Sequence, residues 1–283
     1  DLDHNALDGD VFAPLSSLTQ LTYLDLYDNK PDNWSFLATL VNLEHLNIAG
    51  VKRHGASREA LRNLKKLKWL DFSWSGRDDA YEKSTGNYNY IIDVVSELTE
   101  LEYLNLCGWY NISKLQGTTG SGGIGNLTKL KTLILNYNYV QDLTPLLACT
   151  QLEELHLAYG RINWNKNADN LACLLDESGN LTLPLKKLDL RKPDDRADYF
   201  VAGYPSHETV NKLYRLHKQG KLELGYDWRW IDELAGMQPH VDSTGARYIA
   251  YEDFGTFRKA GSDDWWAMQN AHDYANEHGC EVR

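Results

Sequence analysis

A short leucine pattern, Leu-x-x-Leu-x-[Leu/Ile/Phe], constrains the fold of this 283-residue chain more than any other feature. Seven copies occur, beginning at residues 21, 43, 67, 101, 130, 152 and 185. The last two apolar residues of a copy lie two apart, on one side of a short strand, and the first Leu points into the same core. One copy cannot bury that side alone. The copies are therefore expected to stack, with their strands in one parallel sheet.

Two partial copies extend the series, one at each end of the chain. The aligned pairs are Leu2 with Leu26, Asn5 with Asn29, Leu222 with Leu188 and Leu224 with Leu190. With them the repeat comprises eight to nine units, the first one truncated. The chain starts inside that unit, at "DLDHNAL", without a Met or a secretory segment. This start predicts a processed or trimmed fragment.

The repeats resemble those of leucine-rich-repeat proteins. The segments "LTYLDLYDNKPDNWSFLATLVNLEHLNIAG" and "LTKLKTLILNYNYVQDLTPLLACTQLEELHLAYG" are similar to the 22-residue class typified by bacterial internalins, and the resemblance covers roughly residues 1–226. The expected fold is an α/β, right-handed leucine-rich-repeat solenoid, shaped like a horseshoe. It would have a concave parallel β-sheet, helices and turns on the convex side, and a C-terminal cap.

The resemblance also implies a ladder of hydrogen bonds from Asn side chains to neighbouring backbone. Asn occupies the ninth position of a copy only at Asn5, Asn29 and Asn138. The equivalent positions that depart from Asn are Val51, Ser75, Trp109, Gly160 and Pro193. We therefore expect the ladder to be broken and the solenoid to be less regular than an internalin.

Beyond about residue 228 the repeat stops, which predicts a solenoid over 1–228 and a capping region over 229–283. The end of a solenoid exposes a row of core side chains that must be covered. Two long intervals, 75–98 and 107–127, are expected to contain loops, formed by the polar "GRDDAYEKSTGNYN" in the first and the Gly-rich "GTTGSGGIGN" in the second. The Gly-rich "GTTGSGGIGN" within the second lacks the Lys-Ser/Thr of a phosphate-binding loop.

Helices are expected in the last third of the chain. Residues 206–220 have Ser206 as an N-cap and a Gly stop, and about 263–278 would begin after Ser262 and end at Gly279. The segment "ADNLACLLDES" predicts a further short amphipathic helix.

Stacking also predicts which residues face the concave surface: those at the third, fifth, seventh and eighth positions of each copy. The predicted ligand-binding residues are Tyr23, Asp25, Tyr27, His45, Asn47, Trp69, Asp71, Trp74, Tyr103, Asn105, Tyr137, His156 and Tyr159. Tyr and Trp dominate binding hot spots. Tyr and Trp also pack well against one another across strands. For any single residue, the alternative interpretation is therefore that it stabilises the sheet and does not bind a ligand.

Composition and motifs exclude several classes of function. A formal net charge of −11 disfavours a nucleic-acid partner, and no apolar run of about 18 residues could insert into a membrane. Hydrolase, metalloprotease and P-loop motifs are absent, and Asp25 and Asp71 lie two copies apart, roughly 10 Å at sheet spacing. His272 and His278, six residues apart, do not share a helix face. We expect no catalysis, no cofactor and no metal.

The four cysteines form no Cys-x-x-Cys pair. Cys149 and Cys173 lie about one repeat apart in apolar segments. We interpret them as buried free thiols in preference to a disulfide.

The sequence favours a non-enzymatic module, a monomer that binds a protein, or less favourably a glycan, through its concave face. By analogy with internalins it would be bacterial, adhesive, and secreted or attached to the cell surface. The alternative is a structural or assembly subunit that contacts neighbours through loops 75–98 and 107–127 and the Trp-rich cap. An enzyme with its active site in the cap is a third, weaker hypothesis.

Overall fold

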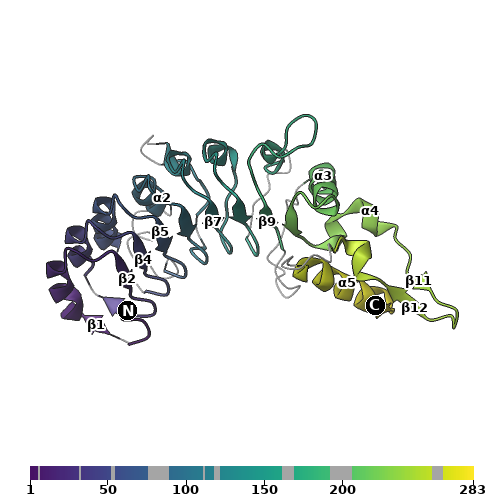
Figure 1. Ribbon diagram of the computed structural model, residues 1–283, viewed down its shortest axis with the longest axis horizontal. Coiled ribbons are helices and arrows are strands. Elements are labelled where there is room, and N and C mark those ends of the chain that lie inside the picture. The colour runs from purple at the N-terminus through teal and green to yellow at the C-terminus, as the bar shows by residue number, and fades with distance from the viewer. Residues whose placement is uncertain are drawn as a thin grey trace.

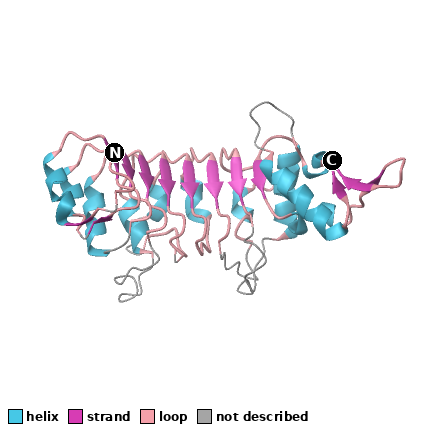
Figure 2. Cartoon of the chain, turned by 90° about the horizontal axis from the view of Figure 1, so that it is seen from below, coloured by secondary structure: helices cyan, strands magenta, loops and turns pink. Residues whose placement is uncertain are grey.

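The stacked repeats form an arch, with a parallel sheet along its inner side (Figure 1). The computed structural model describes residues 1–5, 7–31, 33–51, 55–75, 89–110, 112–117, 122–160, 169–191, 206–256 and 264–283. The eight neighbouring strands are β2 (Tyr23–Asp25), β4 (His45–Asn47), β5 (Trp69–Asp71), β6 (Tyr103–Asn105), β7 (Thr132–Ile134), β8 (Glu154–His156), β9 (Lys187–Asp189) and β10 (Glu223–Gly225). Figure 2 shows them side by side and pointing the same way. The predicted leucine-rich-repeat solenoid is confirmed.

The central leucine of every strand is buried and lies in register with its neighbours. The eight residues are Leu24, Leu46, Leu70, Leu104, Leu133, Leu155, Leu188 and Leu224, none more than 3% exposed. Because side chains alternate along a strand, burial of this position turns the residues on either side of it toward the concave surface.

The last strand corrects a predicted alignment. Leu224 pairs with Leu188, and Gly225 pairs with Asp189, so setting Leu224 on Leu190 was wrong by two residues. Alternation in "LELG" has a period of two, so a two-residue shift leaves every side chain on the same face. Hydrophobic pattern alone could not distinguish the two registers.

On the convex side the repeats return through short 3₁₀ helices, as the turn-like spacing predicts. These are η1 (Asp10–Ser17), η2 (Ser35–Thr39), η3 (Gly55–Asn63), η4 (Gly123–Asn126), η5 (Thr144–Ala148) and η6 (Ala172–Leu174), with one α-helix, α2 (Tyr90–Val95). Leucines in these segments make hydrogen bonds to the carbonyl three residues earlier; for example, Leu37 N donates to Trp34 O and Leu40 N to Leu37 O, both at 3.0 Å. The predicted amphipathic helix in "ADNLACLLDES" is only the short η6.

Charged side chains at the second position of the copies pair between neighbouring repeats. Nζ–Oε2 distances are 2.7 Å for Lys68–Glu44, 2.6 Å for Lys131–Glu102 and 2.8 Å for Lys186–Glu153. Exposed pairs of this kind contribute little stability. Their alternating signs nevertheless disfavour a shifted pairing, in which like charges would face one another.

The C-terminal third adds two longer helices to the end of the arch. Helix α3 (His207–Lys218) begins as predicted, with Ser206 Oγ accepting a hydrogen bond from Thr209 N at 3.2 Å. Helix α5 (Trp265–His278) ends as predicted at Gly279, in a left-handed conformation. Its N-cap residue is Asp264, and the predicted cap Ser262 lies outside the described residues.

Smaller elements complete the chain. They are β1 (Asp8–Gly9) paired with β3 (Lys30–Pro31), η7 (Trp228–Trp230), α4 (Asp232–Ala235), η8 (Tyr251–Phe254), and a sheet of β11 (His240–Val241), β12 (Arg247–Ile249) and β13 (Glu281–Val282). Across the described ranges, no helix has the length and apolar content needed to cross a membrane.

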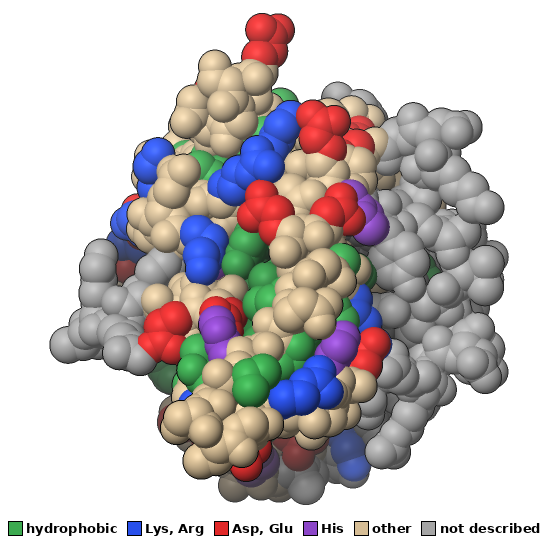
Figure 3. Space-filling view, turned by 90° about the vertical axis from the view of Figure 1, so that its right-hand side faces the viewer, with side chains coloured by type: hydrophobic (Ala, Val, Ile, Leu, Met, Phe, Trp, Pro, Cys, Tyr) green, Lys and Arg blue, Asp and Glu red, His purple; other side chains and the backbone are tan. Residues whose placement is uncertain are grey.

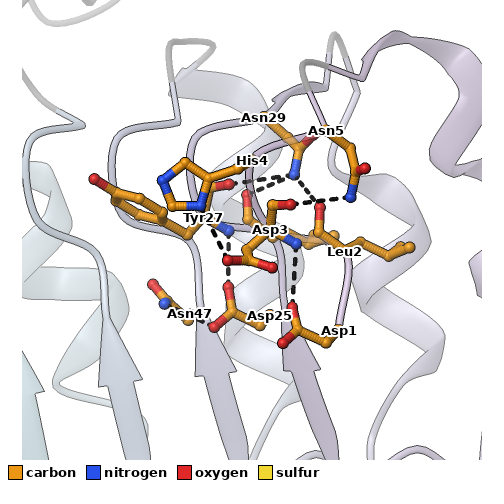
Figure 4. A network of polar contacts seen from close by, with 10 residues as sticks. Asp1, Leu2, Asp3, His4, Asn5, Asp25, Tyr27, Asn29 and Asn47 are labelled. Carbon is orange, nitrogen blue, oxygen red and sulfur yellow. Dashed lines mark hydrogen bonds and ion pairs between the residues drawn. The ribbon is translucent and has the colours of Figure 1, made fainter.

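The ladder expected from Asn residues is real, but it also uses other side chains. Asn29 Nδ2 donates to Leu2 O at 2.7 Å, as seen in Figure 4, and Asn138 Nδ2 donates to Leu106 O at 2.8 Å. The side chain of Asn5 instead bonds within its own turn, to Asp3 O at 3.0 Å.

Two positions that depart from Asn reach the same backbone acceptor, the sixth-position carbonyl of the preceding repeat. Ser75 Oγ donates to Ile48 O at 3.2 Å, and Trp109 Nε1 donates to Phe72 O at 2.6 Å. The expectation of a ladder broken at Ser75 and Trp109 was therefore wrong. A hydroxyl or an indole N–H replaces the amide because only a donor of suitable reach is required.

Candidate functional site

Four aromatic rings at the third strand position form one continuous stack across the concave sheet. Ring centroids are 4.4 Å apart for Tyr23–His45, 3.9 Å for His45–Trp69 and 4.7 Å for Trp69–Tyr103, with interplanar angles of 15°, 7° and 5°. The strands β2, β4, β5 and β6 set this spacing because neighbouring strands lie about 4.8 Å apart. The predicted third-position residues are thus brought together.

Stacking determines what this column can offer a ligand. The faces of His45 and Trp69 are covered by their neighbours, so only ring edges are open to solvent. Tyr23, at the end of the stack, is 48% exposed. Burial lowers the pKa of His45 despite the nearby Asp25 carboxylate, so its imidazole is neutral at pH 7.

The fifth-position residues are held in place by the backbone. Oδ1 of Asp25, Asn47, Asp71 and Asn105 accepts a hydrogen bond from the amide two residues later, at 2.9–3.1 Å. Such a side-chain turn ends each strand at the same point. The recurring Asp/Asn at this position is a signal for the turn that the sequence interpretation missed.

The second oxygen of each carboxylate bonds across to the next strand. Asn47 Nδ2 donates to Asp25 Oδ2 at 3.0 Å (Figure 4), and Asn105 Nδ2 donates to Asp71 Oδ2 at 2.9 Å. These four side chains form a rigid polar strip beside the aromatic stack. Both oxygens of each carboxylate accept hydrogen bonds within the protein. The two aspartates therefore hold neighbouring strands and turns in place, and are not arranged as an acid–base pair.

His156 lies apart from this strip, toward the C-terminal end. Its Nδ1 is 3.7 Å from Asp189 Oδ2, and its Nε2 is 3.5 Å from Glu154 Oε2. Asp189 is fully buried. Burial alone would raise the pKa of Asp189, but hydrogen bonds from His156 and Arg191 outweigh it and the net shift is downward.

The eighth position, in the turn after each strand, has a left-handed backbone in every described repeat through residue 160. The residues are His4, Asp28, Gly50, Trp74, Gly108, Tyr137 and Tyr159, with φ between 51° and 72°. Glycine adopts this conformation without strain, whereas a bulky residue is strained by about 1 kcal/mol. Three of the seven positions nevertheless carry Trp or Tyr.

These three aromatic residues form a second row, the turn row, at the carboxyl ends of the strands. Ring centroids are 5.3 Å apart for Trp74–Tyr137 and 5.0 Å for Tyr137–Tyr159. Gly108 makes the first contact possible, since a Cβ there would lie 2.4 Å from the Trp74 ring. Tyr110, which the sequence interpretation did not select, lies 6.0 Å from Trp74 and 6.3 Å from Tyr137.

Tyr27 does not belong to the turn row. Its ring packs edge-on against His4, with centroids 4.6 Å apart. Gly50 stands between Tyr27 and the turn row. The predicted residues therefore form three groups: the aromatic stack, the polar strip and the turn row, with Tyr27 and His156 outside them.

The turn row continues at its C-terminal end into a cation and two tryptophans of α5. Arg191 Cζ lies 5.3 Å from the Tyr159 ring centroid, 4.7 Å from that of Trp265 and 3.9 Å from that of Trp266. Trp266 Nε1 also donates to Glu223 Oε1 at 2.9 Å. Helix α5 thus docks against the inner side of the last strands.

The close approach of Trp266 requires a glycine in β10. A Cβ at Gly225, the fifth position of the last strand, would lie 2.9 Å from both the Trp266 ring and Asp189 Oδ1. Because the predicted register was wrong by two residues, the sequence did not show that Gly225 occupies the fifth position of this strand. The packing of Trp266 against it was therefore not predicted.

Metal and thiol chemistry is not indicated within the part of the chain that the structure describes. No group of three or more His, Cys, Asp or Glu residues there could hold a metal ion. All four cysteines are free thiols; Cys149 is buried as predicted, whereas Cys173, also expected to be buried, is only partly so, and Cys107 is buried as well. Burial raises the pKa of Cys149 to about 11, and burial together with the Asp71 charge raises that of Cys107 to about 12.

Comparisons with known proteins agree with this architecture. Residues 13–121 match a family model described as Zer-1-like leucine-rich repeats. Comparison with curated proteins finds no match. Together with the eight-stranded parallel sheet, the match to this family model confirms the predicted resemblance to leucine-rich-repeat proteins at the level of the fold. Proteins with such repeats typically bind other proteins and are typically not enzymes.

Similar solved structures are distant in sequence. Internalin C2 from Listeria monocytogenes is 18% identical with a TM-score of 0.47, covering 70% of this chain and 74% of that one. Internalin F from the same organism is 20% identical with a TM-score of 0.36, covering 76% and 63%. The ectodomain of the Arabidopsis thaliana membrane receptor kinase GASSHO1/SCHENGEN3, solved in complex with Casparian strip integrity factor 2, is 19% identical with a TM-score of 0.48, covering 80% of this chain and 24% of that one.

Proposed function

We propose that this chain is a non-enzymatic recognition module that binds a protein partner through the turn row and the adjoining concave face. The observation that carries the proposal is the backbone of Trp74, Tyr137 and Tyr159, each in a left-handed conformation at φ 58°, 61° and 57°. Gly50 and Gly108 fill the equivalent position elsewhere, so the fold itself does not need an aromatic there. A strained backbone conformation that is kept by a bulky residue, at a position where glycine would fit without strain, is typical of functional sites.

Rigidity supports the same proposal. The stacked rings and the bonded polar strip already hold their side chains in one conformation, so little rotamer freedom would be lost when a partner binds. Trp74 is 45% exposed and Tyr23 48% exposed, which leaves apolar surface at both aromatic groups. A protein loop would contact both ring edges and amide groups. A sugar ring would need open aromatic faces, which the stack covers, and this makes a glycan the weaker choice.

By analogy with internalins, we extend the proposal to a bacterial adhesion protein, secreted or attached to the cell surface. The alternative function, an assembly subunit, would use loops 75–98 and 107–127 and the Trp-rich cap. Of these loops, residues 76–88, 111 and 118–121 lie outside the described residues. The boundary near residue 228 remains a proposal for the start of the cap.

The test is capture of partners from a library of surface proteins and glycans. The immobilised wild type is compared with a Trp74→Gly/Tyr137→Gly/Tyr159→Gly variant. A Val41→Ala/Leu147→Ala variant is the matched control, because it removes exposed apolar area from sites outside the turn row and the concave strands. Light-scattering mass is measured for all three proteins.

We expect monomers, with a protein captured by the wild type and the control but lost by at least tenfold in the turn-row variant. Capture that survives the turn-row substitutions would refute the proposal. A discrete oligomer that is indifferent to them would favour the assembly subunit, and a captured glycan would replace the protein partner.

A further inference from the structure

A buried histidine of α3 closes the outer edge of β10, the last strand of the eight-stranded sheet. His217 is 2% exposed, and its Nδ1 lies 3.2 Å from Leu224 N and 3.0 Å from Leu222 O. On the edge of β10 that faces β9, Glu223 N donates to Lys186 O at 2.7 Å. Because backbone groups alternate along a strand, Leu224 N and Leu222 O face the opposite, outer edge. The imidazole therefore occupies the place where a further strand would bond.

The hydrogen bond from Leu224 N requires a neutral imidazole. Nδ1 can accept this bond only through its lone pair, with the ring proton on Nε2. A proton on Nδ1 could be donated to Leu222 O, but Leu224 N–H would then lose its acceptor. A buried donor without an acceptor destabilises the fold. The geometry thus fits the neutral ring and conflicts with the charged one.

Two tyrosines pack around the imidazole and cannot neutralise a charge on it. The ring centroids of Tyr214 and Tyr226 lie 6.4 and 5.8 Å from that of His217. Both hydroxyls donate to backbone, that of Tyr214 to Asp253 O at 3.1 Å and that of Tyr226 to Phe254 O at 3.0 Å. Burial raises the pKa of Tyr214 to about 12 and that of Tyr226 well above its ordinary value, so both stay neutral.

Charged groups around His217 do not reverse its preference for the neutral form. Burial is the largest influence on the pKa of His217 and lowers it, and the neighbouring Lys218 ammonium lowers it further. Hydrogen bonds to the Leu222 and Phe254 carbonyls, and the charge of Asp264 at the start of α5, act in the opposite direction. The net shift is downward, so the ring is neutral at pH 7.

Other charged groups on the elements packed against His217 have partners elsewhere. Glu223 Oε1 lies 2.7 Å from Lys187 Nζ, and Asp253 Oδ2 lies 3.0 Å from His240 Nε2. Lys218 Nζ donates to a backbone carbonyl of η8, 3.1 Å away. The acidic group that bears most on protonation of His217 is therefore Asp264.

The turn that ends η8 covers the ring of His217. A Cβ at Gly255, whose φ is 87°, would lie 3.0 Å from His217 Cδ2, so the backbone there is in direct contact with the imidazole. Helix η8 packs on α5, and α5 packs on β10. His217 therefore lies between the edge of β10 and the turn through which the cap is held there.

We propose that His217 is a pH-sensitive latch, which holds η8 and α5 over the edge of β10 when it is neutral and releases them when it is protonated. Release would let water reach both the charged ring and Leu224 N–H. The open form takes up its proton at the ordinary pKa of 6.5, so opening is favoured as the pH falls below 6.5, until the lowered pKa of the closed form is reached.

The latch goes beyond the proposed function and does not require a partner. It would nevertheless act on the C-terminal end of the turn row. Trp265 and Trp266 of α5 contact Arg191, which in turn contacts Tyr159. Release of α5 would remove these contacts.

The test follows amide hydrogen exchange of the full chain by NMR between pH 7 and pH 4, expressed as protection factors that correct for the intrinsic effect of pH. Leu224 reports on the edge of β10, and Leu133, in β7, reports on global unfolding. The variant is His217→Asn, whose side-chain amide can occupy the place of Nδ1 but cannot be protonated. Figure 3 faces this end of the molecule and shows histidine side chains on its surface among acidic and basic ones. His207→Asn, which removes an exposed histidine from the same helix, is therefore the matched control.

We expect the protection of Leu224 in the wild type to fall at least tenfold over this range, while that of Leu133 is unchanged. Each pH unit below 6.5 favours opening tenfold until the lowered pKa is reached. The control should show the same fall, and His217→Asn should show none. Constant protection of Leu224 in the wild type, or an equal fall in His217→Asn, would overturn the latch. An equal fall at Leu133 would also overturn it, because the chain would then unfold as a whole.

The wild type alone also tests the latch, should His217→Asn fail to fold. The imidazole carbon signals of His217 should titrate below pH 6.5, together with the loss of protection at Leu224. Titration at or above pH 6.5, or titration that leaves Leu224 protected, would contradict the proposal.

Discussion

At the scale of single residues, different side chains perform one structural task. Asn29, Ser75, Trp109 and Asn138 all donate to the sixth-position carbonyl of the preceding repeat. The shared requirement is a donor that reaches a buried acceptor, because an unsatisfied carbonyl destabilises the fold. Residue identity at this turn is therefore a poor guide to whether the bond exists.

Replacing Trp109 by Phe tests this equivalence. The substitution keeps an aromatic ring against Phe72 but removes the donor 2.6 Å from Phe72 O. We expect the free energy of unfolding to fall by about 1–3 kcal/mol, as is usual for an orphaned buried acceptor. Urea denaturation of the two proteins measures it, and a loss under about 0.5 kcal/mol would show that the bond is dispensable.

Substitutions at Tyr137 test whether the left-handed backbone of the turn row is strained. Because its φ is 61°, Gly should be tolerated there better than Ala, although both remove the ring. The expected difference is about 1 kcal/mol in favour of Tyr137→Gly over Tyr137→Ala. Denaturant midpoints of the two variants measure it. If Ala is as stable as Gly, the backbone at this turn is not strained and the main support for the proposed function is lost.

The sandwiched histidine His45 makes a prediction about pH. Its pKa in the folded chain lies below the ordinary value of 6.5, and burial lowers that of His217 as well. Protonation therefore favours unfolding: the stability is complete above pH 6.5 and is lost as the pH falls through the lowered values. Melting temperatures should drop between pH 7 and pH 5. The drop should be smaller in His45→Phe, which keeps the stack, and an equal drop would contradict this account.

Sequence reasoning placed these residues well but could not assign their roles. Alternation along the strands correctly put Tyr23, His45 and Trp69 on one face. It could not show that their faces cover one another, because ring orientation depends on packing with the neighbouring strand. Nor could it show the left-handed backbone at Trp74, since a bulky residue in that conformation contradicts local preference.

At the scale of elements, glycines decide where aromatic side chains can lie. Gly108 permits the Trp74 ring to reach Tyr137, and Gly225 permits Trp266 to reach the end of the sheet. The solenoid and the helices α3 and α5 could be predicted from the repeats and the helix caps. The docking of α5 on the concave side did not, because it depends on one register that alternation leaves ambiguous.

Gly108→Ala should separate these effects. The added Cβ would lie 2.4 Å from the Trp74 ring, at φ 72°. Gly245→Ala is the control, since its φ is 85° but no atom lies within 4 Å of the added Cβ. We expect Gly108→Ala to be the more destabilising by about 1–3 kcal/mol, the usual range for overpacking. Equal losses in thermal unfolding would mean that the Trp74 ring moves away freely.

At the scale of the whole molecule, the repeats set three parallel rows along one arch: the aromatic stack, the polar strip and the turn row. The first two are held by contacts that the fold itself explains. The turn row retains aromatic residues on a left-handed backbone, of which Trp74 is 45% exposed, and its C-terminal end lies beside α5. This difference between the three rows is the reason for placing the proposed partner surface on the turn row.

The most direct test of that central claim is amide hydrogen exchange of the chain with and without its captured partner. The account predicts slower exchange in the turns that follow β5, β7 and β8, and no change in the convex helices η2 and η5. Protection confined to the convex helices, with the turns around Trp74, Tyr137 and Tyr159 unchanged, would contradict it.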